Sequence, residues 1–101
     1  MVTVADQNVF PDEIEQFLSK HFTAGPLAVV PVSDDKRGHR LAAVIADKAH
    51  KPKLESAIDL CRKTLGTHRT PKYILVAEHL PQLASGKLDY SKITAWAEDQ
   101  L

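Results

Sequence analysis

The chain has a single cysteine, Cys61, and no long run of apolar residues. One cysteine cannot form an intrachain disulfide, which excludes a small secreted scaffold held together by disulfides. No window approaches the roughly 20 apolar residues of a membrane-spanning helix. The N-terminus does not combine a basic start with a long apolar stretch, as a secretion signal would. We therefore expect a cytoplasmic protein without a membrane span, with Cys61 as a small core residue rather than a nucleophile.

The chain also lacks an excess of charge of either sign, because 13 basic side chains balance 13 acidic ones. A protein that binds nucleic acid or an anionic membrane needs a basic excess, so neither is an expected partner. The five histidines do not fall at zinc-binding spacings, and we predict no metal site. With 44% hydrophobic residues, residues 1–101 are expected to form a single domain with one modest core.

The sequence pattern predicts short strands that alternate with amphipathic helices. Helices are expected to begin near Pro11 and Pro52, because proline suits the first turn of a helix. A third helix is expected to begin at Tyr90. The first helix is expected to stop before Gly25 and Pro26, and the second is expected to stop at Gly66. Strands are expected at 1–4 and 8–10, which would form a hairpin, and at 27–32, 41–46 and 73–77. The fold class is therefore α+β: a small three-stranded sheet, mixed or antiparallel, flanked by helices and preceded by an N-terminal two-stranded hairpin.

A lysine on a loop of small residues is the main candidate for chemistry. Ser85 and Gly86 let the backbone bend freely before Lys87. A lysine in such a loop can reach a ligand with three N–H donors and a full positive charge. The loop is not a Walker A phosphate loop, because Pro81 and Leu88 stand where that motif needs glycine and serine or threonine. A solvated loop lysine without a ligand is the alternative interpretation.

Four segments strengthen the functional interpretation. Residues 8–15 read Asn-Val-Phe-Pro-Asp-Glu-Ile-Glu, residues 30–38 Val-Pro-Val-Ser-Asp-Asp-Lys-Arg-Gly, residues 68–74 His-Arg-Thr-Pro-Lys-Tyr-Ile, and residues 80–90 Leu-Pro-Gln-Leu-Ala-Ser-Gly-Lys-Leu-Asp-Tyr. In this order they resemble motifs of the C-terminal domain of the adenylate-forming (AMP-binding) superfamily, of the acyl- and aryl-CoA ligase type. The last of those motifs runs from Leu-Pro through Gly-Lys to Asp and usually Arg. Together the four segments cover nearly the whole chain.

The resemblance implies a catalytic role for Lys87. In this family the corresponding lysine enters the active site of a larger N-terminal adenylation domain, where it contacts the carboxylate of the acid and oxygens near the α-phosphate of ATP. Ser85 and Gly86 would support the loop, and Asp89 would either brace it or cap the last helix. The N-terminal domain would belong to the same chain or be a separate one. ATP with Mg²⁺, and CoA, are expected to bind only together with it, and none to this chain alone.

The resemblance also implies a second surface, which faces CoA when the thioester forms. The family has a Gly-Gly pair just before the first of the four motifs, and Ala5 and Asp6 stand there in this chain. They add a β-carbon and a charge where the backbone should approach a ligand. Tyr90, in place of the usual Arg, is a milder departure. The possible CoA-facing residues are Ala5, Asp6, Gln7, Lys36, Arg37 and Arg69. For the basic ones a solvated charged surface is the alternative.

Three functions are open on the sequence alone. The first is the C-terminal domain of an adenylate-forming acid:CoA ligase, excised or free-standing and inactive by itself, which supplies Lys87 to a nucleotide-binding domain. The second is a non-catalytic interaction or regulatory module that keeps the fold, which the residues at positions 5 and 6 favour. The third is an unrelated α+β binding domain whose motif matches arise by chance.

Overall fold

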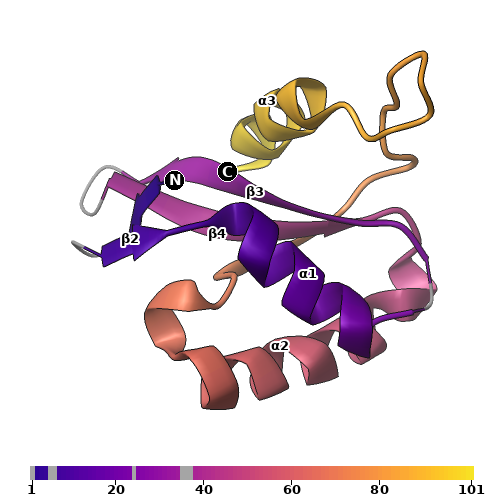
Figure 1. The fold of residues 1–101 in the computed structure, drawn as a ribbon. Coiled ribbons are helices and arrows are strands. Elements are labelled where there is room, and N and C mark those ends of the chain that lie inside the picture. Colours follow the sequence, from indigo (N-terminus) through magenta and orange to yellow (C-terminus); the bar gives the residue numbers. More distant parts are fainter. Residues whose placement is uncertain (1, 5–6, 24, 35–37) are drawn as a thin grey trace.

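The fold comes from a computed structural model that describes residues 2–4, 7–23, 25–34 and 38–101 (Figure 1). The predicted α+β class is confirmed, including the N-terminal hairpin. Within the described residues the elements are, in order, β1 (Val2–Val4), β2 (Gln7–Val9), α1 (Pro11–His21), β3 (Leu27–Asp34), β4 (Gly38–Ile45), η1 (Lys48–His50), α2 (Lys51–Leu65), η2 (Thr67–Arg69), β5 (Tyr73–Val76) and α3 (Tyr90–Gln100).

Local chemistry sets the ends of the first two long helices. Pro11 and Pro52 lie in the first turns of α1 and α2, where a missing N–H leaves no bond unmade. The α2 helix ends at Gly66, whose φ of 95° lies in the left-handed region that glycine adopts without strain. The N–H of Gly66 donates to the carbonyl oxygen of Arg62 at 3.1 Å, which satisfies one carbonyl of the last turn.

The sheet is mixed. β3 and β4 are antiparallel over their whole length, from the pair Leu27 and Ile45 to the pair Asp34 and Gly38. β5 is parallel to β4, because α2 forms the crossover that returns the chain to the same end of the sheet. The β1–β2 hairpin joins the edge of β4 that also carries β5, through the single pair Val4 and Gly38. The sheet order is thus β2-β1-β4-β3, with β5 beside β4.

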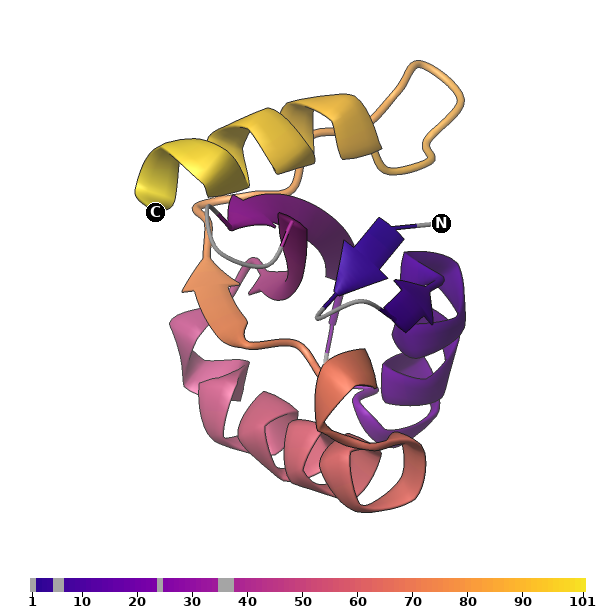
Figure 2. The same ribbon diagram turned by 90° about the vertical axis from the view of Figure 1, so that its left-hand side faces the viewer.

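Helices cover both faces of this sheet. Figure 1 shows α1 and α2 on one face and α3 on the other, and the view in Figure 2 shows the same three layers from the hairpin end. Leu27 and Val29 of β3 face α1 and α2, whereas Val30 faces α3. Because both faces are buried, β3 and β4 read in the sequence as nearly continuous apolar runs.

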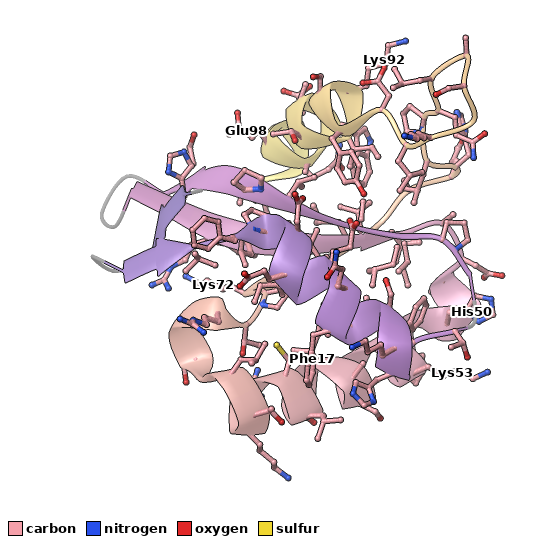
Figure 3. The ribbon with its side chains drawn as sticks, viewed as in Figure 1. Phe17, His50, Lys53, Lys72, Lys92 and Glu98 are labelled. Carbon is pink, nitrogen blue, oxygen red and sulfur yellow. The ribbon has the colours of Figure 1, made fainter. Side chains whose placement is uncertain are left out.

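The core divides into two clusters, one on each side of the sheet. Ile14, Leu18 and Cys61 are buried between the sheet and the helices α1 and α2, where Figure 3 shows Phe17 between the two helices. On the other side, Ile93 and the half-buried Trp96 pack α3 against the sheet. Cys61 is therefore a core residue, as predicted. Burial raises the pKa of its thiol, which keeps the thiol protonated and unreactive.

Most of the outer edge of β3 is protected against further strand pairing. The N–H of Val29 donates to Oε1 of Glu15 at 2.9 Å, and the N–H of Ser33 donates to Oε1 of Glu98 at 3.1 Å. Pro31, which lies between them with the same orientation, has no N–H to offer. At positions 29, 31 and 33 the donor that an added strand would use is therefore taken or missing, which is one way in which proteins protect edge strands from aggregation.

Across the described ranges, each helix is too short or too polar to span a bilayer. The same residues hold no group of three His, Cys, Asp or Glu side chains placed to bind a metal ion.

Candidate functional site

The loop that carries Lys87 folds as a small hairpin. The N–H of Leu83 donates to the carbonyl oxygen of Lys87 at 2.7 Å, and the N–H of Gly86 donates to that of Leu83 at 2.9 Å. Gln82 and Leu88 face each other as an isolated antiparallel bridge. The N–H of Asp89 closes the base of the loop by donating to the carbonyl oxygen of Pro81 at 2.9 Å. Residues 81–89 thus form a hairpin braced by hydrogen bonds, which we call the Lys87 hairpin. The composition of this loop predicts only a bend.

Gly86 makes the turn of this hairpin possible. Its φ is 89°, in the region that other residues adopt only with strain. A β-carbon added at Gly86 would meet nothing within 4 Å, so glycine is required by the backbone angle and not by crowding. The turn directs the chain back along the hairpin and leaves Ser85, Gly86 and Lys87 exposed at the tip.

We expect Gly86→Ala to open this turn more often without unfolding the domain. The left-handed conformation costs an L-residue about 1–2 kcal/mol, which corresponds to roughly five- to thirtyfold more frequent opening. Amide hydrogen exchange at residue 86, followed by NMR, measures this directly. Gly86→Asn is the matched control, because asparagine tolerates positive φ and should accelerate exchange less. Equal exchange rates in all three proteins would contradict this role of the glycine.

Lys87 is exposed, and its amine has no partner within the part of the chain that the structure describes. Among the described residues, no carboxylate or other acceptor forms a hydrogen bond or ion pair with it. A full positive charge therefore stands at the tip of a hydrogen-bonded hairpin, available to anything that docks at this end of the molecule. The geometry suits a cation that serves an anionic group outside this chain.

Asp89 caps the helix that follows the loop. Its side chain accepts a hydrogen bond from the N–H of Lys92 at 3.2 Å, and α3 begins at the next residue. Of the two roles considered for Asp89, its carboxylate thus performs the cap. Its backbone N–H closes the base of the hairpin, so this residue connects the loop to α3.

Sequence reasoning missed the partner of Tyr90. The Tyr90 hydroxyl donates to Oε2 of Glu15 on α1 at 2.6 Å, and the other oxygen of Glu15 accepts from Val29 in β3. Burial, followed by the hydrogen bond and charge of Glu15, raises the pKa of the Tyr90 phenol, so the hydroxyl keeps its proton and remains a donor. The two residues are 75 positions apart. The only sequence signal was that each falls within a family motif.

Of the other predicted residues, Gln7 and Arg69 lie within the described part of the chain. Ala5, Asp6, Lys36 and Arg37 lie outside the described residues. Their described neighbours Val4 and Gly38 pair with each other. Gln7 is the first residue of β2, and η2, which ends in the exposed Arg69, packs beside β2. The two described members of the possible CoA-facing set therefore lie at the end of the sheet that carries the β1–β2 hairpin, whereas the Lys87 loop protrudes at the far end (Figure 1).

Comparison with known proteins identifies the family. The sequence model of the AMP-binding enzyme C-terminal domain family matches residues 13–87, and the match ends at Lys87. The chain is 31% identical over its whole length to an uncharacterised acyl-CoA ligase of Bacillus subtilis. It is 30% identical over 92% of its length to a 2-succinylbenzoate–CoA ligase of Listeria monocytogenes. The chain belongs to the AMP-binding enzyme C-terminal domain family, and it spans about a fifth of the length of these two curated relatives.

Solved structures agree on the fold. An acyl-CoA synthetase of Brucella canis matches 98% of the chain with a TM-score of 0.78 and 29% identity, over 19% of its own chain. An amide bond synthetase of Marinactinospora thermotolerans matches 93% of the chain with a TM-score of 0.74 and 30% identity, also over 19% of its own chain. An unrelated α+β domain with chance motif matches is therefore no longer a candidate.

Proposed function

We propose that this chain acts as the C-terminal domain of an acid:CoA ligase and supplies Lys87 to a companion adenylation domain. The observation that carries the proposal is the exposed amine of Lys87, unpaired among the described residues, at the tip of a braced hairpin. The family membership and the names of the relatives, which are acyl- and aryl-acid:CoA ligases, support it.

Adenylation explains why a lysine is useful at this tip. The carboxylate of the acid attacks the α-phosphorus of ATP and pyrophosphate leaves, so two negative groups must first be brought together. A positioned ammonium group offsets this repulsion and stabilises the charge that spreads over the phosphoryl oxygens in the transition state. Because the amine of Lys87 is not neutralised by a described residue of its own domain, its whole charge is available for this purpose.

The surface beside the loop supports a companion domain at this end. A mainly apolar groove of about 410 Å³ lies between the end of β5 and α3; Val76, Leu80 and Trp96 line it together with the polar residues Glu78 and His79. Leu83, on the hairpin itself, is 50% exposed. Apolar surface next to a charged tip is typical of a face that becomes covered by another protein surface.

The positions of the two candidate surfaces support a ligase that works in two steps. The Lys87 loop and the β1–β2 hairpin lie at opposite ends of the sheet (Figure 1). One orientation of the domain can present only one of them to a given active site. We therefore propose that the domain turns between adenylation and transfer to the thiol, so that each end is used in its own step.

The experiment that tests this function is acid-dependent exchange of pyrophosphate into ATP, measured with the companion adenylation domain in the presence and absence of this chain. A panel of fatty and aryl acids supplies the substrate. We expect exchange to rise when the chain is present. If the companion domain works equally well without it for every acid, the proposed function is wrong.

The second candidate function is a non-catalytic interaction module derived from the same fold. The replacement of the family's glycine pair by Ala5 and Asp6 favours it, because a side chain at these positions obstructs close approach of a thiol ligand. A module of this kind would bind the companion domain without changing the exchange rate, so the same experiment distinguishes the two functions.

Restoring both glycines, Ala5→Gly with Asp6→Gly, is expected to raise CoA-dependent turnover several-fold without changing pyrophosphate exchange. The physical reason is that the pair is proposed to act only where the thiol approaches. The comparison of the two rates in one preparation is its own control, because a general change in folding would alter both. Unchanged rates in both assays would remove the proposed role of these positions in the thioester step.

A further inference from the structure

Two side-chain contacts tie α3 to the outer edge of β3, one at each end of the helix. At its start, the Tyr90 hydroxyl binds Glu15, which also accepts from the N–H of Val29. Near its end, Oε1 of Glu98 accepts from both the hydroxyl and the N–H of Ser33, at 3.0 and 3.1 Å, and Figure 3 shows Glu98 on the helix above the sheet. Ile93, Trp96 and Ala97 add apolar packing of α3 against the sheet.

The contact at the start of α3 lies directly after the Lys87 hairpin. Asp89 closes the base of the hairpin through its N–H, and Tyr90 is the next residue. The Lys87 hairpin is braced by its own hydrogen bonds and is joined through Asp89 to the first turn of α3, so we expect the hairpin to follow that turn. Any tilt of this turn is therefore carried to the amine of Lys87 at the tip.

Apolar packing alone holds the first turn of α3 with little directional preference, because contacts between aliphatic groups are not oriented. The Tyr90 hydroxyl bond is oriented and short, and its acceptor is a carboxylate held at a second point by the β3 backbone. Among the described residues, this bond is the side-chain hydrogen bond between α3 and the rest of the domain that lies nearest to the Lys87 hairpin.

We infer that Tyr90 is a positioning residue: through Glu15 it sets the direction in which the Lys87 hairpin leaves the domain. The inference rests on the proposed function for its effect on the reaction, but the orientation of the hairpin can be measured independently. An error of about 1 Å in the place of a catalytic group can cost as much as a hundredfold in rate. A contact that controls the angle of the hairpin therefore controls the chemistry of a lysine that it does not touch.

Loss of the hydroxyl in Tyr90→Phe tests the inference, and Ser33→Ala is the matched control. Each variant removes one exposed hydrogen bond made by a hydroxyl group between α3 and the rest of the domain. Ser33, however, contacts the end of α3 that is remote from the Lys87 hairpin. Spin labels on cysteines introduced at Ala84 and Ser19 report the distance between the hairpin tip and α1. Cys61 is fully buried and should remain unlabelled.

We expect the distribution of label distances to broaden in Tyr90→Phe and to match the parent protein in Ser33→Ala. The same narrow distribution in all three proteins would overturn the inference. This measurement needs only the present chain, so its outcome does not depend on whether the chain takes part in a ligase.

The effect on the reaction is measured by pyrophosphate exchange with the companion domain. We expect Tyr90→Phe to lower kcat roughly tenfold while the KM values for acid and ATP change little, because binding is retained and only the placement of the amine is altered. Ser33→Ala should stay near the parent rate. Equal losses in Tyr90→Phe and Ser33→Ala would show a merely structural role and overturn the inference.

Variants of Glu15 sharpen this test. Glu15→Gln should keep most of the rate, because its amide oxygen can accept from Val29 while its amide nitrogen donates to the Tyr90 oxygen. Glu15→Ala should lose as much as Tyr90→Phe, and the double variant should lose no more than Glu15→Ala alone. Additive losses in the double variant would show that the two residues act separately. If the parent protein does not raise pyrophosphate exchange, the proposed function is refuted. The spin-label distances then decide by themselves whether Tyr90 orients the Lys87 hairpin.

Discussion

Replacing Lys87 with alanine is expected to lower the rate of acid-dependent pyrophosphate exchange by about two to three powers of ten, the usual effect of removing one charged or hydrogen-bonding group that stabilises a transition state. The loss should appear in kcat. The folded domain should be as stable as the parent, because no described residue forms a hydrogen bond or ion pair with the Lys87 amine. A change in rate without a change in stability would identify a functional lysine.

Lys92→Ala is the matched control for this prediction. Lys92 is an exposed lysine in the first turns of α3, five positions along the chain from Lys87 (Figure 3). Its removal changes the net charge by the same amount, but its side chain starts from the helix and not from the hairpin tip. If Lys87→Ala and Lys92→Ala lose the same small amount of activity, the charge of Lys87 contributes only through the overall electrostatic potential of this surface. The specific role of Lys87 would then be refuted.

The second large effect is expected on stability, from Ile93→Ala. Ile93 is 1% exposed and packs α3 against the sheet. Truncation of a fully buried isoleucine to alanine costs about 2–5 kcal/mol, from the lost transfer free energy and from the cavity that remains. Small domains have a total stability of about 5–15 kcal/mol, so this single change removes a large fraction of it. Urea unfolding followed by circular dichroism measures the difference.

A graded series controls this experiment. Ile93→Val removes a single methyl group and should cost about 0.5–1.5 kcal/mol. Leu83→Ala, at a half-exposed position on the hairpin, should change the free energy of unfolding by no more than about 0.5 kcal/mol. A cost for Ile93→Ala as small as that for Leu83→Ala would mean that α3 is not packed as described. The Lys87 hairpin would then lack a firm base.

Most of the secondary structure could be predicted, because its signals are local. Proline in the first helical turn, glycine at a helix end and continuous apolar runs act over a few residues, so they can be read from neighbours in the chain. The candidate lysine was found in the same way, from the small residues before it and from the family motif. The hydrogen bonds that brace its hairpin were not found, because they depend on backbone angles that the side chains leave open.

Polar contacts between distant elements could not be predicted. Nothing in the sequence assigns a partner to Glu15 or Glu98, yet each accepts a hydrogen bond from a backbone N–H at the outer edge of β3. Tyr90 likewise reads only as a departure from a motif. Carboxylates on exposed helix faces are so common that the pattern does not distinguish those with a partner from those without one. Their partners become known only once the helices are placed over the sheet.

The sequence by itself therefore determined the elements, the α+β class, the family and the identity of the lysine at the loop tip, because all of these are carried by short segments. The tertiary structure alone decided that β5 is parallel to β4, that the Lys87 loop and the β1–β2 hairpin lie at opposite ends of the sheet, and that Tyr90 meets Glu15 beside the Lys87 loop. The physical reason is that a side chain's partner across 75 positions is selected by the packing of layers, which no local pattern encodes.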